Sequence, residues 1–142
     1  MKYSKISYEN LNAKQKEAYN FQKVSAVLSD FGFITVPLAN DWNGADFLAI
    51  HNEGGVLKVQ LKGRMTFDKK YLNKDLYICF RDAQDWFIYP HDRLFELVKS
   101  ESTMTESQSW LKDGSYNYPK LSEKHRAFLK DYRLAEALES AA

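Results

Sequence analysis

Residues 57–62 alternate strictly between apolar and polar side chains, and this alternation constrains the fold more than any other feature of the chain. Successive side chains of a β-strand point to opposite faces, so the pattern places Lys58, Gln60 and Lys62 together on one face. A strand-like segment over residues 46–50, apolar after Asp46, precedes this segment, and the loop between them contains a glycine pair. Together the two segments predict a β-hairpin.

A helix is predicted over residues 12–31, where apolar residues recur at three- and four-residue steps. Asn12 is suited to cap the beginning of this helix, and Gly32 is suited to end it. A short strand is then predicted over residues 33–36, and it ends at Pro37. The hairpin therefore follows a helix and a strand.

The rest of the chain continues this mixture of strands and helices. We predict a polar loop over residues 63–75, strands over 76–80 and 86–89, and helices over 91–99 and from Ser122 onward. The order of one helix, five strands and two helices predicts an α/β fold in which a mixed β-sheet is flanked by helices. The length of 142 residues fits a single domain over residues 1–142.

The composition excludes some classes of protein and leaves nucleic-acid binding open. The 20 basic and 19 acidic residues nearly cancel, so only a local cluster of Lys and Arg could bind phosphates. The single cysteine, Cys79, excludes an intrachain disulfide and a cysteine-rich zinc site, and we expect it to be buried. The lone cysteine fits a reducing compartment, and the sequence shows no membrane-spanning stretch and no signal peptide. We therefore predict a cytoplasmic protein without a membrane partner.

Polar residues at two points of the hairpin form a candidate site. Asp46 begins the first hairpin strand, and the second strand carries the spacing Gln60-x-Lys62. We expect Asp46 and the Gln60 end to share one edge of the sheet only if the hairpin is splayed or its strands are unequal. Residues 21–62 resemble the PD-(D/E)XK nuclease superfamily. The core of that family has a helix, a strand, a strand that opens with Asp and a strand that carries an acid-x-Lys pair, and the same elements are expected here in that order. Gln60 stands where the family usually has its second acid, and in this respect the chain is similar to the Gln-x-Lys subgroup.

The resemblance implies a restriction-endonuclease-like fold and a metal-dependent endonuclease that hydrolyses phosphodiester bonds of DNA. It implies that Asp46, the Gln60 amide oxygen and the main-chain carbonyl of Leu61 hold Mg²⁺, with Mn²⁺ as an alternative ion. It also implies that Lys62 holds a water or stabilises charge on the phosphate, and that Glu17 is the acid from the first helix. A homodimer would be needed to cut both DNA strands together.

These residue types suit that chemistry because Mg²⁺ prefers hard oxygen ligands, often one or two carboxylates with waters and a substrate phosphate. An amide in place of a carboxylate removes one negative charge, so we expect a lower metal affinity than in a two-acid site. Each residue also has an ordinary structural interpretation. Gln60 and Lys62 fit the solvated face of a strand, Asp46 fits a turn carboxylate, and Glu17 fits a solvated helix residue.

Lys69, Lys70 and Lys74 form a basic stretch that also contains Phe67 and Tyr71. We predict that this stretch is mobile and contacts the DNA backbone, because basic loops beside a cleft commonly hold phosphates. The alternative is a solvated loop without a ligand.

The histidines and Trp42 are assigned structural positions. His51, His91 and His125 lack metal-ligand spacing and are interpreted as surface residues. Trp42, beside the turn that precedes Asp46, is interpreted as part of the core.

Three functions fit the sequence. The first is a DNA endonuclease, which the intact Asp46 and Lys62 favour. The second is a nucleic-acid-binding module with a weakened site, which Gln60 keeps open. The third is a protein-interaction module on the same fold.

Overall fold

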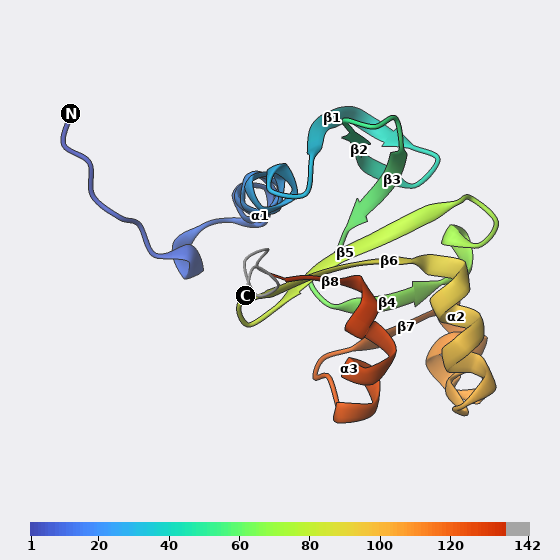
Figure 1. Cartoon of the computed structure of the whole chain (residues 1–142). Coiled ribbons are helices and arrows are strands. Elements are labelled where there is room, and N and C mark those ends of the chain that lie inside the picture. The colour runs from blue at the N-terminus through green and yellow to red at the C-terminus, as the bar shows by residue number, and fades with distance from the viewer. Residues whose placement is uncertain (136–142) are drawn as a thin grey trace, which may run out of the picture.

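The computed structural model describes residues 1–135, so residues 136–142 of the predicted domain lie outside the described part (Figure 1). Within that part, the main sheet has six strands in the order β1-β2-β3-β5-β6-β8. Only β3 and β5 run parallel, and the other neighbours are antiparallel. The bounds are β1 (Phe33–Trp42), β2 (Ala45–His51), β3 (Val56–Leu61), β5 (Leu76–Asp82), β6 (Asp85–Pro90) and β8 (Arg133–Leu134).

Helices and a second small sheet surround the main sheet. The helices are α1 (Ala13–Ser29), α2 (His91–Ser100) and α3 (Glu123–Leu129), and the small sheet pairs β4 (Met65–Asp68) with β7 (Ser115–Tyr118). Short helical segments are η1 (Tyr8–Asn10), η2 (Lys69–Tyr71), η3 (Met104–Glu106), η4 (Ser109–Asp113) and η5 (Lys130–Tyr132). The predicted α/β class, a mixed sheet flanked by helices, is confirmed.

Helix α1 begins where the sequence predicts. The Asn12 side chain accepts a hydrogen bond from the Gln15 N–H at 2.8 Å, and the Gln15 side chain accepts one from the Asn12 N–H at 2.9 Å. This reciprocal pair satisfies two N–H groups that have no partner within the helix. The helix ends at Ser29, and Gly32 follows it with a φ of +84°.

Strand β1 is longer than predicted, because it continues through Pro37 to Trp42. Since β1 lies at the edge of the sheet, the missing N–H of Pro37 interrupts no pairing on a second side. The turn into β2 is therefore short, with positive φ angles at Asn43 and Gly44. The core assignment of Trp42 is wrong, because 53% of this residue is exposed.

The two faces of the main sheet pack against different layers. On one face, Phe47, Val59 and Cys79 pack with Val24 and Leu28 of α1, so the buried position predicted for the cysteine is confirmed. The other face packs against β4, β7, α2 and α3 through a larger core that contains most of the buried aromatic residues. Figure 1 shows α1 beside the β1–β3 end of the sheet and the other helices beyond β5 and β6.

The segment after the hairpin is not a polar loop. Met65 and Phe67 in β4 are fully buried, and only 3% of Tyr71 in η2 is exposed. The expectation that no apolar residue holds this stretch is therefore wrong, since Phe67 and Tyr71 pack in the core. Its mobility and its contact with DNA stay predictions. No helix in the described part of the chain has the length and apolarity to cross a bilayer.

Candidate active site

The β2–β3 hairpin brings Asp46 and Gln60 together at its open end. The antiparallel register pairs Phe47 with Val59, and Asp46 and Gln60 are the next residues outward on the two strands. They therefore point to the same face of the sheet. The expectation that this needs a splayed hairpin or unequal strands is wrong, because the beginning of one antiparallel strand always lies beside the end of its partner.

Asp46 is oriented by the end of β3. Its Oδ2 accepts a hydrogen bond from the N–H of Leu61 at 2.8 Å. The N–H of Lys62 donates to the carbonyl of Cys79 at 2.8 Å, on the β5 side. The backbone at the candidate site is thus held from both sides, by a carboxylate and by the parallel neighbour strand.

A cavity of about 490 Å³ opens at this end of β3. The sequence-predicted residues Asp46, Gln60, Leu61, Lys62 and Glu17 all line it. Its complete lining comes from η1, α1, β2, β3 and the residues that follow β3: Tyr8, Ala13, Lys16, Glu17, Asn20, Asp46, Gln60, Leu61, Lys62 and Gly63. The structure therefore gathers the predicted acids, amide and lysine around one space.

Helix α1 contributes one continuous face to the cavity. Ala13, Lys16, Glu17 and Asn20 recur at steps of three and four residues, so they lie along one side of the helix. The position of Glu17 on a helical turn facing β3 agrees with the role that the resemblance implies for it. Lys16 and Asn20 could have been found by extending the spacing from Glu17.

The sequence gives no signal for Tyr8, because only the path of the chain before α1 places it here. Its hydroxyl accepts a hydrogen bond from the Asn20 Nδ2 at 2.9 Å. The Lys16 Nζ lies 5.2 Å from the centroid of the Tyr8 ring. The segment before the helix thus supplies an aromatic wall to the cavity.

The ammonium of Lys62 rests on an aromatic face. Its Nζ lies 5.6 Å from the centroid of the Tyr71 ring, which a cation favours because the face of the ring carries partial negative charge. The Lys70 Nζ lies 5.2 Å from the same centroid. Lys70 therefore shares the Tyr71 ring with Lys62, although it does not line the cavity.

The other two predicted DNA-binding lysines lie elsewhere. The Lys69 Nζ lies 5.4 Å from the ring centroid of Trp110, in the aromatic core region of η4. Lys74 is exposed in the turn before β5, and its carbonyl accepts a hydrogen bond from the Lys58 Nζ at 2.7 Å. Neither lines the Asp46 cavity.

The available metal ligands are oxygens of mixed type. Asp46 and Glu17 supply carboxylates, Gln60 supplies an amide oxygen, and Leu61 supplies a carbonyl. Residues 1–135 contain no cluster of three or more His, Cys, Asp or Glu side chains arranged to hold a metal. The set fits Mg²⁺, which is held in many sites by one or two carboxylates with waters and substrate oxygens, and it does not fit zinc.

The histidines do not belong to this site. His91, predicted to lie on the surface, is fully buried, and its Nε2 accepts a hydrogen bond from the Asp68 N–H at 3.1 Å. Its Nδ1 lies 2.9 Å from the Asp92 Oδ1. Burial lowers the pKa of His91 below its usual value, against the opposing effect of Asp92. His91 is thus a neutral structural residue that joins β4 to α2.

Comparisons with protein-family models, curated proteins and solved structures gave no match to this chain. What can be said of its function therefore rests on its own residues and their geometry.

Proposed function

We propose that this chain is a metal-dependent endonuclease of the PD-(D/E)XK type, which hydrolyses phosphodiester bonds of DNA with Mg²⁺ or Mn²⁺. One observation carries the proposal: Asp46, Gln60, Leu61, Lys62 and Glu17 line a single cavity at the open end of the β2–β3 hairpin. These residues come from a helix and two strands, in the order that the restriction-endonuclease-like fold requires.

Each residue has a proposed role that follows from its chemistry. Asp46, with the Gln60 amide oxygen and the Leu61 carbonyl, would hold the ion, and Glu17 would add a second carboxylate from α1. A bound Mg²⁺ supplies polarisation of the scissile phosphate and a water of lowered pKa. The Lys62 ammonium would stabilise negative charge that builds on the phosphate.

The hydrogen bond between Asp46 and Leu61 supports these roles. It holds one carboxylate oxygen of Asp46 against the strand that carries Gln60 and leads into Lys62. The position of the Asp46 carboxylate relative to these two residues is therefore restrained. Such positioning is the main contribution that a protein makes to phosphoryl chemistry.

A cleavage assay tests the proposal. Supercoiled plasmid and single-stranded DNA are incubated with the protein in Mg²⁺, in Mn²⁺ or in EDTA. We expect cleavage in either metal and none in EDTA, and we expect Asp46→Asn to remove it. Asp30→Asn, at the far end of α1, is the matched control and should cleave like the wild type.

A nucleic-acid-binding module without cleavage is the second candidate. It is favoured by the orientation of the Gln60 amide, whose Nε2 lies 3.5 Å from the Leu61 carbonyl oxygen. This nitrogen donates a hydrogen bond to an oxygen that the endonuclease would need as a metal ligand. Binding of DNA without cleavage in any metal would select this candidate over the endonuclease.

A further inference from the structure

A second cavity, of about 380 Å³, continues from the first. The two share Tyr8, Asn20, Leu61, Lys62 and Gly63. The second cavity adds residues from α1 and from the β5–β6 hairpin, namely Tyr19, Arg81, Ala83 and Trp86. A ligand seated at Asp46 and Lys62 can therefore extend directly into it.

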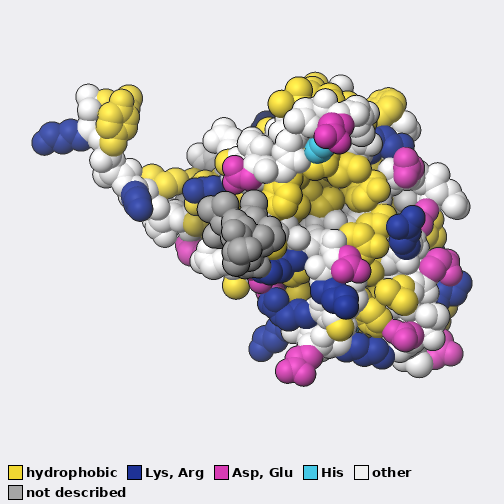
Figure 2. Space-filling view, in the orientation of Figure 1, with side chains coloured by type: hydrophobic (Ala, Val, Ile, Leu, Met, Phe, Trp, Pro, Cys, Tyr) yellow, Lys and Arg dark blue, Asp and Glu magenta, His cyan; other side chains and the backbone are white. Residues whose placement is uncertain are grey.

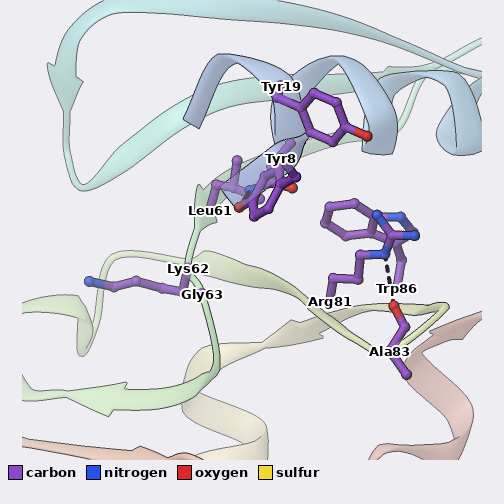
Figure 3. Close-up of a pocket in the computed structure, with 9 residues that line it drawn as sticks. Tyr8, Tyr19, Leu61, Lys62, Gly63, Arg81, Ala83 and Trp86 are labelled. Atoms are coloured by element: carbon purple, nitrogen blue, oxygen red, sulfur yellow. Dashed lines mark hydrogen bonds between the residues drawn. The ribbon is translucent and has the colours of Figure 1, made fainter. Parts of the chain in front are cut away.

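Aromatic side chains and an arginine form opposite walls of this second cavity. Tyr8 and Tyr19 stand on one side, with ring centroids 5.2 Å apart and planes tilted by 56°. Arg81 and Trp86 stand on the other, with the guanidinium carbon 5.4 Å from the indole centroid. Figure 3 shows Tyr19 above, Tyr8 on the left beside Leu61 and the Arg81–Trp86 pair on the right, with the Lys62 side chain running away from all of them.

The walls are held in place before any ligand binds. The Arg81 Nε donates to the Ala83 carbonyl at 2.9 Å, and an Arg81 terminal nitrogen donates to the Gln84 Oε1 at 3.3 Å. Trp86 is only 5% exposed and belongs to the core beneath α1. Asn20 orients Tyr8 through the hydrogen bond to its hydroxyl.

The lining suits a planar aromatic group that is joined to an anion. Among the described residues that line the second cavity, Arg81 places a cation at its wall, Lys62 directs its side chain away from it, and none is acidic. Its volume is in the range of small-molecule sites. Aromatic rings and arginine planes are the surfaces on which unpaired bases stack.

We propose that this cavity holds an unpaired nucleobase of the substrate, next to the phosphate that lies at Asp46 and Lys62. The proposal deepens the nuclease function above and rests on it. A base inside a duplex is stacked on both faces and can enter such a cavity only by leaving the helix. The preferred substrate is therefore single-stranded or locally unpaired nucleic acid.

Binding assays without cleavage test this inference. Fluorescein-labelled 12-mers, as single-stranded DNA, single-stranded RNA and duplex DNA of one sequence, are titrated with protein in EDTA and followed by anisotropy. We expect single strands to bind more tightly than the duplex. Stacking on one aromatic residue changes affinity by about 5- to 160-fold, so Tyr19→Leu should weaken single-strand binding by a factor in that range. Tyr19→Phe keeps the ring and should bind like the wild type.

Two controls separate stacking from folding. Tyr116→Leu removes a half-buried tyrosine that lines a different cavity, and it should bind like the wild type. Thermal unfolding of Tyr19→Leu and Tyr19→Phe should agree, because both replace the same partly exposed side chain. A position scan with one abasic residue should show a single site at which the missing base reproduces the Tyr19→Leu loss.

The outcomes distinguish this inference from the proposed function. The base cavity is overturned if single strands and duplex bind equally and Tyr19→Leu has no effect. The nuclease proposal still stands in that case if cleavage depends on metal and on Asp46. Tyr19-dependent binding of single strands without cleavage supports the base cavity and overturns the nuclease. Tighter binding of RNA than of DNA supports the cavity and changes the substrate. No binding of any strand overturns the base cavity, and no binding together with no cleavage in either metal overturns both.

Discussion

Aromatic residues gather in two regions of this protein, and the regions differ in what surrounds the rings. Around Phe67, rings pack edge to face with Tyr89, His91, Phe95 and Tyr118 at centroid distances of 5.7–6.0 Å. Around Tyr19, rings border an open cavity. The first arrangement stabilises the fold by burial, whereas the second places rings at the wall of an open cavity, with Lys16 over Tyr8 and Lys23 over Tyr19.

The polar groups of the two regions differ in the same way. In the Phe67 region, the Tyr89 hydroxyl donates to the Thr66 carbonyl at 2.6 Å and accepts from the Thr66 N–H at 2.9 Å. In the Asp46 region, carboxylates, lysines and two amides line a cavity. Figure 2 shows hydrophobic side chains gathered over the β1–β3 end of the sheet, so exposed apolar surface alone does not mark the candidate site. Charge and open volume together distinguish the candidate site from the rest of the surface.

The largest effect is expected when the charge of Asp46 is removed, which tests whether the Asp46 region is a catalytic site. We expect Asp46→Asn to lower cleavage on the order of 100-fold or more, because the ligand charge is lost. The amide oxygen can still accept the Leu61 N–H, so the midpoint of thermal unfolding should stay close to that of the wild type. Cleavage rates from plasmid nicking, measured beside unfolding curves, check both parts. Wild-type rates in Asp46→Asn would remove Asp46 from the catalytic site.

The opposite test opens the Phe67 region. Phe67 is fully buried, so Phe67→Ala should destabilise the protein by about 3–5 kcal/mol through the cavity that it leaves. Urea unfolding followed by circular dichroism measures this change. Tyr19→Ala is the matched truncation in the open region and should cost much less. Equal losses in the two variants would show that the rings around Tyr19 are as structural as those around Phe67.

A smaller effect is expected from charge added to the candidate site. Gln60→Glu places a second strand carboxylate beside Asp46, so Mg²⁺ and Mn²⁺ should bind roughly tenfold more tightly. Calorimetric titration of both ions into the wild type and the variant gives the ratio. Glu53→Gln, in the exposed hairpin loop, is the control for a general change in charge. Identical metal affinities in the wild type and Gln60→Glu would mean that residue 60 does not contact the ion.

The smallest effect separates two neighbouring lysines. Lys70 shares the Tyr71 ring with Lys62, whereas Lys69 lies over Trp110. If Lys70 contacts a phosphate, Lys70→Ala should reduce the slope of log affinity against log salt by about 0.7–0.9. Lys69→Ala should leave the slope unchanged. Anisotropy titrations at several salt concentrations provide the slopes, and equal slopes in both variants would exclude a specific role for Lys70.

Local patterns were sufficient for most of the individual elements. The capping pair of Asn12 and Gln15 and the alternation that sets the faces of Gln60 are decided by neighbours in sequence, so they could be predicted. The prediction was wrong at Pro37, where the edge position of β1 made an N–H unnecessary. It was also wrong for Phe67 and His91, because their burial depends on β7 and α2 rather than on adjacent residues.

By itself, the sequence determined the α/β class, the hairpin and the residue types of the candidate site, because backbone periodicity and turn chemistry act over a few residues. Only the tertiary structure decided which of these residues share a space. It brought Glu17, Lys16 and Tyr8 to the hairpin, kept Lys69 and Lys74 away from it, and formed the cavity of Tyr19, Arg81 and Trp86. Such contacts join segments far apart in the chain, and they follow from how α1 and the β5–β6 hairpin pack against the end of β3, which no local pattern specifies.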